Sequence, residues 1–311
     1  MRVSALAPVP APAPPTVWVD DVAGLAALAD ALGRACRVGI DSEWADPPGW
    51  AVGAEGAGAG AQLAGGALIF GSAGSSVGCA VIATVQLAVV DECGERAFVC
   101  DALLGGAAAL ERCAAGDAPA ADGLAGSGLA RSLGPLGLAG GPSLGPAAER
   151  LEYARGLAAL LRPLLLSPGP PRAVGFAFAA DAQKLALWLD AAEGADAGVS
   201  GGAAGGAAGE SALIRAGTID VQSLAEEAGL GSRAQAPSLR ATCAHWLAHE
   251  LDKGVQTSDW AVRPLSAEQL RYAATDASAC LRVLAAMELD WGVGAEVEAV
   301  PLLRLPGADA V

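Results

Sequence analysis

Positive charge is scarce in this chain of 311 residues. It has 19 lysine and arginine residues against 34 aspartate and glutamate residues, for a formal net charge of −15. The only lysines are Lys184 and Lys253. This balance argues against a protein that holds phosphate groups by bulk positive charge, and it predicts weak non-specific binding to nucleic acid.

Paired cysteine motifs and long apolar runs are also missing. The seven cysteines form no C-x-x-C pair, and no histidine stands at zinc-finger spacing, so neither a zinc finger nor a disulfide framework is indicated. No run approaches the ~18 apolar residues of a membrane span. Prolines interrupt the first 15 residues, where a signal peptide needs an apolar helix. We expect an intracellular protein of the nucleus or cytoplasm, with no membrane partner; the lack of acids in residues 1–19 leaves an organellar transit peptide open.

Apolar residues are abundant at 53%, which is ample for a buried core. The 42 glycines and 19 prolines indicate that flexible, low-complexity segments interrupt this core. We expect three Gly/Ala-rich insertions, at about residues 51–78, 105–145 and 191–209. They lie within one domain over residues 17–290, between a disordered Pro/Ala tail (1–16) and a C-terminal tail (291–311).

The hydrophobic pattern predicts an α/β fold with a mixed sheet. We expect five strands, at residues 37–40, 80–90, 96–100, 173–178 and 218–221. The second and third should form an antiparallel hairpin. Helices are expected at residues 22–32, 149–166, about 179–190, 221–228, 238–250 and 266–288. The last helix is the best specified, because Ser266 and Gln269 have the spacing of a reciprocal capping box.

Three acidic residues lie where strands end and helices begin. Asp41 and Glu43 are two residues apart on or just past a strand, so both carboxylates project to one side and can share a hard cation. Asp181 follows the strand at 173–178 and opens the next helix, at an edge where α/β sheets place ligands. The alternatives stay open: solvated strand-end acids for Asp41 and Glu43, and a helix first-turn acid for Asp181.

Tyr272 and Asp276 are four residues apart in the last expected helix and therefore share one face. The neighbouring side chains are small or apolar, so a carboxylate on this face needs a partner. That partner is either a metal ion or an arginine, with Arg271 and Arg282 as the structural alternatives.

Three other polar residues are interpreted as structural. His245 and His249 have i, i+4 spacing but lack an H-E-x-x-H pattern, so they predict a polar helix face rather than a metal site. Asp101 ends a strand, as Asp41 does, and is the main decoy among the acids. We expect Trp246 and Trp260 to be packing residues.

Several of these segments together resemble the four-carboxylate (DEDDy) 3′→5′ exonucleases, which include ribonuclease D, the Werner-syndrome exonuclease domain and Nibbler-like proteins. The sequence Asp-Ser-Glu-Trp at residues 41–44 is most similar to that of the Nibbler-like proteins. The segments that carry the resemblance are Val38–Trp44, Gln86–Leu87, Val174–Leu185, Leu251–Leu265 and Tyr272–Ala277. It covers roughly residues 37–286 without the insertions.

The resemblance implies an RNase H-like fold, with a mixed five-stranded sheet flanked by helices, and two-metal phosphodiester hydrolysis with Mg²⁺ or Mn²⁺. By similarity, Asp41 would bridge both ions. Glu43 and Asp276 would complete one site, and Asp181 would hold the other ion. Tyr272 would orient the attacking water.

The implied substrate is single-stranded or 3′-overhanging nucleic acid, RNA or DNA, which would be released as nucleoside 5′-monophosphates. Asp101 matches a family position that is not a metal ligand. Because basic residues are few, a protein partner that captures substrate stays open. So does a catalytically inactive module that uses the same fold to bind nucleic acid or protein.

Overall fold

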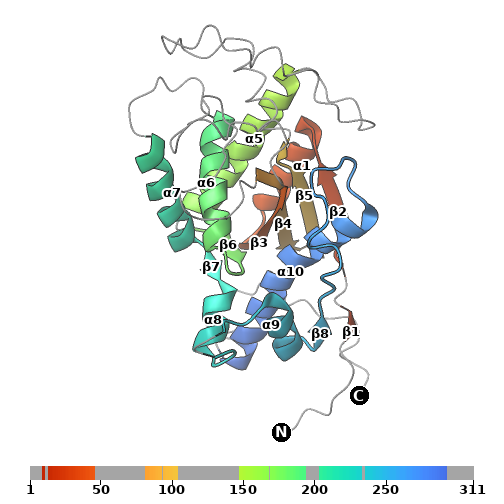
Figure 1. Ribbon diagram of the computed structural model, residues 1–311, viewed down its shortest axis with the longest axis vertical. Helices are drawn as coiled ribbons and strands as arrows, with labels where there is room; N and C mark the ends of the chain where they lie inside the picture. The colour runs from red at the N-terminus through yellow and green to blue at the C-terminus, as the bar shows by residue number, and fades with distance from the viewer. Residues whose placement is uncertain are drawn as a thin grey trace, which may run out of the picture.

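The protein is described by a computed structural model that covers residues 9–10, 13–45, 81–92, 94–103, 147–167, 169–193, 203–232 and 235–292. These residues form a mixed sheet with helices packed against it (Figure 1). The expected insertions at 51–78 and 105–145 lie outside the described residues, as does the expected tail beyond Gly292. Within the described part, no helix is long and apolar enough to cross a membrane.

Among the described residues, the main sheet has six strands in the order β2-β5-β4-β3-β6-β7. Its strands are β2 (Thr16–Val19), β3 (Arg37–Ala45), β4 (Val81–Asp91), β5 (Gly94–Asp101), β6 (Arg172–Gly175) and β7 (Ile219–Asp220). The β3–β4 and β4–β5 pairs are antiparallel and the others are parallel. The predicted mixed sheet and hairpin are confirmed, but the predicted number of strands is corrected from five to six, because β2 adds an edge strand beside β5.

Differences from the predicted lengths of two strands, β3 and β6, affect the positions of the acidic residues. β3 continues past residue 40 to Ala45, so Asp41 and Glu43 lie inside the strand rather than at its end. β6 stops at Gly175 instead of residue 178. Ala177 there has a positive φ of 52°, and this turn leads the chain into the following helix.

Helices account for most of the remaining described residues. They are α1 (Val22–Leu32), α5 (Ala147–Leu166), α6 (Ala179–Glu193), α7 (Ala203–Gly217), α8 (Val221–Glu227), α9 (Leu239–Trp246) and α10 (Ala267–Asp290). The insertion expected at residues 191–209 is wrong at both ends, because residues 191–193 belong to α6 and residues 203–209 to α7; residues 194–202 lie outside the described part.

A small second sheet joins two distant parts of the chain. Strand β1 (Val9–Pro10) pairs in parallel with β8 (His249–Glu250). The helix predicted over residues 238–250 therefore ends at Trp246, and its last two residues are extended. The Pro/Ala tail predicted to be disordered over residues 1–16 contains strand residues at Val9–Pro10 and at Thr16, the first residue of β2.

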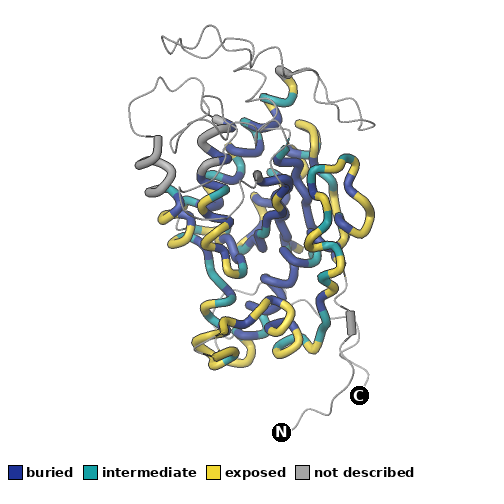
Figure 2. The backbone as a smooth tube through the Cα atoms, in the orientation of Figure 1, coloured by how far each residue is buried: buried dark blue, intermediate teal, exposed yellow. Residues whose placement is uncertain are grey.

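Alternation along β3 separates two cores. Val38 and Ile40 are fully buried in a core with residues of α1, α5 and α6. The intervening Gly39 faces α10, so closely that a Cβ atom there would lie 2.2 Å from the carbonyl oxygen of Ala277. Figure 2 shows the sheet and most of α10 among the buried segments. The absence of a side chain at Gly39 thus lets α10 lie directly on β3.

Candidate metal centre

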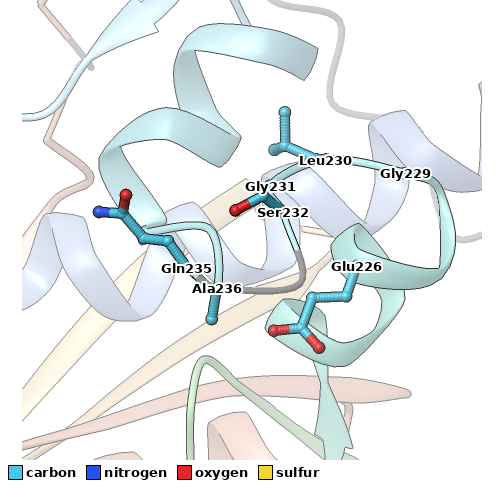
Figure 3. Close-up of a pocket in the computed structure, with 7 residues that line it drawn as sticks. All are labelled: Glu226, Gly229, Leu230, Gly231, Ser232, Gln235 and Ala236. Atoms are coloured by element: carbon cyan, nitrogen blue, oxygen red, sulfur yellow. The ribbon is translucent and has the colours of Figure 1, made fainter.

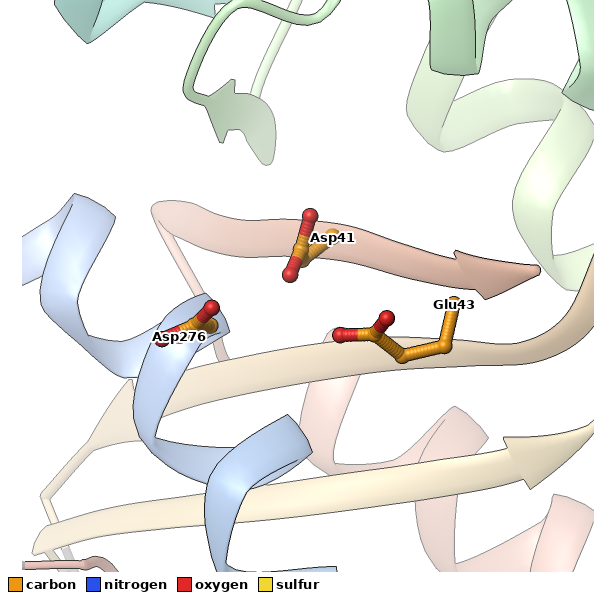
Figure 4. Close-up of side chains that lie close together, drawn as sticks. All are labelled: Asp41, Glu43 and Asp276. Atoms are coloured by element: carbon orange, nitrogen blue, oxygen red, sulfur yellow. The ribbon is translucent and has the colours of Figure 1, made fainter. Parts of the chain in front are cut away.

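The α10 face of β3 carries three converging carboxylates. Asp41 and Glu43 share the face of Gly39 because successive side chains alternate along a strand. Helix α10 crosses this face and adds Asp276. One carboxylate oxygen from each residue lies within 4.8 Å of the others, and Figure 4 shows the three side chains extending toward a common space.

The start of α10 is fixed by its own sequence. The Ser266 side chain accepts a hydrogen bond from the Gln269 backbone, and the Gln269 side chain accepts one from the Ser266 backbone. The predicted capping box is therefore confirmed. With the helix start set by this cap, Tyr272 and Asp276 lie one turn apart on the buried side.

Burial makes these three negative charges costly. Burial, reinforced by Asp276, raises the pKa of Glu43 to about 8. Burial and the neighbouring acids hold the pKa of Asp41 well above its ordinary value. Burial also raises the pKa of Asp276, although Lys253 opposes this shift. Such a cluster favours either protons or a bound cation.

The donor set fits a hard divalent cation. Asp276 is only 3% exposed, yet its Oδ1 atom has no hydrogen-bond partner within the described structure. A buried carboxylate oxygen without a partner is energetically unfavourable. Mg²⁺ and Mn²⁺ prefer oxygen ligands of this kind, so a cation held by Asp41, Glu43 and Asp276 would satisfy this atom.

Lys253 is a residue of this site that sequence reasoning did not assign. Its ammonium donates hydrogen bonds to Asp276 Oδ2 at 2.6 Å and to the Tyr272 hydroxyl at 3.1 Å. The arginine partners considered for Asp276 are not the ones found, because Arg282 instead bonds Glu95. Lys253 lies within the quoted segment Leu251–Leu265, but its sequence position alone does not indicate the contact.

Tyr272 lies beside the cluster, as predicted. It is 6% exposed, and its ring centroid is 6.0 Å from that of Trp260. Burial, together with Asp276, raises the pKa of the Tyr272 phenol above its ordinary value. The hydroxyl therefore stays protonated near neutral pH and can both donate and accept a hydrogen bond.

Asp181 is close to this site but outside the three-residue cluster. It lies in the first turn of α6, and its Oδ1 accepts a hydrogen bond from the Ser42 hydroxyl. Its charge contributes to the raised pKa of Asp41, so the two carboxylates share one electrostatic environment. The structure thus brings three of the four predicted acids together. That all four share two metal ions stays a prediction.

The residues interpreted as structural have other partners. Asp101 forms a buried ion pair with Arg263, with Nε to Oδ2 at 2.7 Å. His245 and His249 lie in different elements, α9 and β8, rather than on one helix. Trp260 is 2% exposed, which confirms its packing role, and Trp246 is partly buried against the α10 core.

A separate hollow lies between the end of α8 and the loop before α9 (Figure 3). Among the described residues that line it, Glu226 is the only ionisable side chain. With one carboxylate and no second ionisable side chain among them, this hollow has no counterpart of the acid cluster on β3 and α10.

Comparison with known proteins supports the sequence resemblance. Residues 215–291, which include Lys253, Tyr272 and Asp276, match a 3′-5′ exonuclease family. No curated protein matches the chain. The Nibbler EXO domain of Aedes aegypti has the same fold, with a TM-score of 0.50, 19% sequence identity and coverage of 89% of both chains.

Two Trypanosoma brucei structures are also similar. The RRP6 catalytic core is 17% identical with a TM-score of 0.48, over 92% of this chain and 52% of that one. RNase D in complex with RNA U12 is 17% identical with a TM-score of 0.47, over 92% of this chain and 64% of that one. The chain thus spans about half of the RRP6 core. Residues 215–291 are thus similar to a 3′-5′ exonuclease family, and the chain shares the fold of the Nibbler EXO domain.

Proposed function

We propose that the protein hydrolyses nucleic-acid phosphodiester bonds from the 3′ end by a two-metal mechanism and releases nucleoside 5′-monophosphates. The observation that carries this proposal is the cluster of Asp41, Glu43 and Asp276, with the unpartnered Oδ1 of Asp276 inside it. A group of carboxylates of which two are buried and one is half-buried, without enough protein cations to balance it, is suited to divalent ions.

Each residue has a proposed part. Asp41, Glu43 and Asp276 hold the first Mg²⁺ or Mn²⁺, and Asp181 joins Asp41 at the second. When bound, the two ions supply the positive charge that stabilises the attacking and leaving oxygens of the in-line displacement. Asp181 is already in the electrostatic environment of Asp41, which supports this division.

Tyr272 orients the attacking water in this proposal. Its hydroxyl receives a hydrogen bond from Lys253 at 3.1 Å and donates to the Asp276 carboxylate, so one oxygen lone pair remains for a water molecule. Because the phenol stays protonated, it positions the water without removing its proton.

The proposed substrates are single-stranded or 3′-overhanging RNA or DNA. The net charge of −15 and the two lysines predict weak capture, so a protein partner is proposed to deliver the substrate. An intracellular location in the nucleus or cytoplasm is part of the same proposal.

The test is degradation of matched 5′-labelled RNA and DNA oligonucleotides in Mg²⁺, Mn²⁺ or EDTA. The expected result is a metal-dependent ladder of products shortened from the 3′ end, with 5′-monophosphates released. Asp41→Asn should abolish it, whereas Glu268→Gln, an exposed acid at the start of α10, should leave it unchanged. No ladder, or one that survives Asp41→Asn, rejects the enzyme.

The second candidate is a catalytically inactive module that binds nucleic acid or protein. The contact of Asp181 with Ser42, outside the three-residue cluster, favours it. The same assay separates the two, because an inactive module binds an oligonucleotide but produces no ladder in either metal.

A further inference from the structure

Trp44 is an exposed aromatic side chain that a hydrogen-bond chain connects to Asp181. It follows Glu43 on β3 and is 37% exposed, although its neighbours Glu43 and Ala45 are buried. The strand register shifts between Glu43 and Trp44, which marks an irregularity at this position. The extra residue of this bulge is Ala83 on β4, so Trp44 keeps the face of β3 that it shares with Ser42. The indole therefore presents a flat surface on the Ser42 side of the strand, toward Asp181.

Hydrogen bonds fix the position of this ring. The Trp44 indole N–H donates to Ser42 Oγ at 2.9 Å, and the Ser42 hydroxyl donates to Asp181 Oδ1. The ring is thus anchored, through one serine, to a carboxylate proposed to hold metal. An aromatic surface that is already held in place loses little conformational entropy when a ligand stacks on it.

A positive charge lies against the same ring. Lys184, in the second turn of α6, places its ammonium over the Trp44 indole. Burial lowers the pKa of Lys184 to about 8, so the side chain is still largely protonated near neutral pH. The chain has only two lysines: one contacts the acid cluster and the other contacts this exposed aromatic ring.

We infer that Trp44 and Lys184 form a subsite for one nucleotide of a single-stranded nucleic acid, in which the indole stacks on the base and the ammonium contacts a phosphate. Stacking tolerates any base, because every base has a π-face, and proteins that bind single strands combine aromatic surfaces with positive charge. This inference rests on the proposed function, which sets the scissile bond at the adjacent cluster.

The test measures binding rather than turnover. Anisotropy of fluorescein-labelled single-stranded oligo(U) and oligo(dT) with phosphorothioate linkages that resist hydrolysis is followed in Mg²⁺, with Asp41 left in place in every variant so that the metal-binding acids are intact. Trp44→Ala should weaken binding roughly 5- to 150-fold, the range expected for one stacked base. Trp44→Phe should recover most of this loss, because a phenyl ring still stacks.

Two further variants define the subsite. Lys184→Met should weaken binding to both oligonucleotides and reduce the salt dependence of binding by about one phosphate contact. Trp291→Ala is the matched control, because Trp291 is 42% exposed at the far end of α10, and its removal should leave affinity unchanged. Circular dichroism and thermal melting of each variant check that it is folded.

Failure of the subsite and failure of the exonuclease give different results. If Trp44→Ala binds the oligonucleotides as tightly as its parent, or loses no more affinity than Trp291→Ala, the subsite is rejected. This holds even if the parent chain produces a ladder that depends on Asp41. If Phe at position 44 binds no better than Ala, stacking is rejected. If binding depends on Trp44 but the parent chain produces no ladder, the subsite stands in a non-catalytic binding protein.

Discussion

At the scale of single residues, the site is defined by an imbalance of charge. Asp41, Glu43 and Asp276 lie together with Lys253 as the cation that contacts Asp276. Asp276 uses one oxygen for Lys253 and leaves the other without a partner. The protein thus compensates part of the negative charge, and we propose that divalent ions compensate the rest.

Replacing Lys253 tests this partial compensation. Lys253→Met leaves Asp276 without its cationic partner, and we expect the free energy of unfolding in EDTA to fall by about 1–3 kcal/mol. Saturating Mn²⁺ should remove most of this difference, because the ion supplies the missing charge. Urea denaturation with and without metal measures both values, with the exposed Arg271→Met as control. An equal loss in EDTA and in Mn²⁺ would contradict the account.

The raised pKa of Glu43 predicts how stability depends on pH. The ordinary value is 4.5, and the folded protein holds the proton up to about 8. Between these two values the unfolded chain loses its proton while the folded chain keeps it, so metal-free stability should fall as pH rises through this window. Thermal melting in EDTA at several pH values measures the trend.

Metal should act against this loss, since the ion binds the ionised carboxylates. The increase in Tm caused by Mn²⁺ should therefore be larger near pH 8 than near pH 5.5. The increase should disappear in Asp41→Asn. If the melting temperature in EDTA instead rises steadily from pH 5 to pH 8, the raised pKa of Glu43 is contradicted.

At the scale of secondary-structure elements, the contact of α10 with β3 assembles the site. It brings Asp276 to Asp41 and Glu43, and it depends on the missing side chain of Gly39. The capping box sets where the helix begins. A change at this contact should therefore affect both stability and metal binding.

Gly39→Ala tests the contact. The new Cβ would meet the Ala277 carbonyl oxygen at 2.2 Å, and backbone there cannot move aside locally, so we expect a loss of about 1–3 kcal/mol in stability and weaker Mn²⁺ binding. Gly33→Ala is the control, because its nearest contact would be an ordinary 3.5 Å. Urea unfolding and calorimetric titration provide the measurements. Equal behaviour of the two variants would mean that the β3–α10 contact does not set the site.

Sequence patterns predicted the elements whose signals are local. The capping box at Ser266 and Gln269, the β4–β5 hairpin and helix α1 all follow from residues close together in the chain. The first half of helix α7, residues 203–209, consists of alanine and glycine, and this composition predicts an insertion rather than a helix. The helix is held by distant contacts, among them the fully buried Ile214 and the ion pair of Glu210 with Arg162.

The site was predictable to a similar degree. The i, i+2 spacing of Asp41 and Glu43 and the i, i+4 spacing of Tyr272 and Asp276 indicated shared faces, and the structure confirms both. The contacts of Lys253 with Asp276 and of Ser42 with Asp181 join residues 23 and 139 positions apart. No local pattern reports such pairs, because they depend on how the elements pack.

At the scale of the whole molecule, the acid cluster combines residues that are far apart in the sequence. β3 supplies Asp41 and Glu43, and α10 supplies Asp276 more than 200 residues later in the sequence. The net charge of −15 predicts that oligonucleotide binding is weak and needs divalent ions. Binding in EDTA should therefore be weaker than in Mg²⁺.

The central claim is that the carboxylates of β3 and α10 bind the divalent ions that cleave nucleic acid. The most direct measurement is Mn²⁺ titration followed by calorimetry, combined with laddering of a 5′-labelled oligonucleotide, for the parent chain and Asp276→Asn. The account predicts that the parent binds Mn²⁺ and shortens the oligonucleotide from its 3′ end, and that Asp276→Asn loses both together. Full laddering by Asp276→Asn, or a parent chain that binds no Mn²⁺, would contradict it.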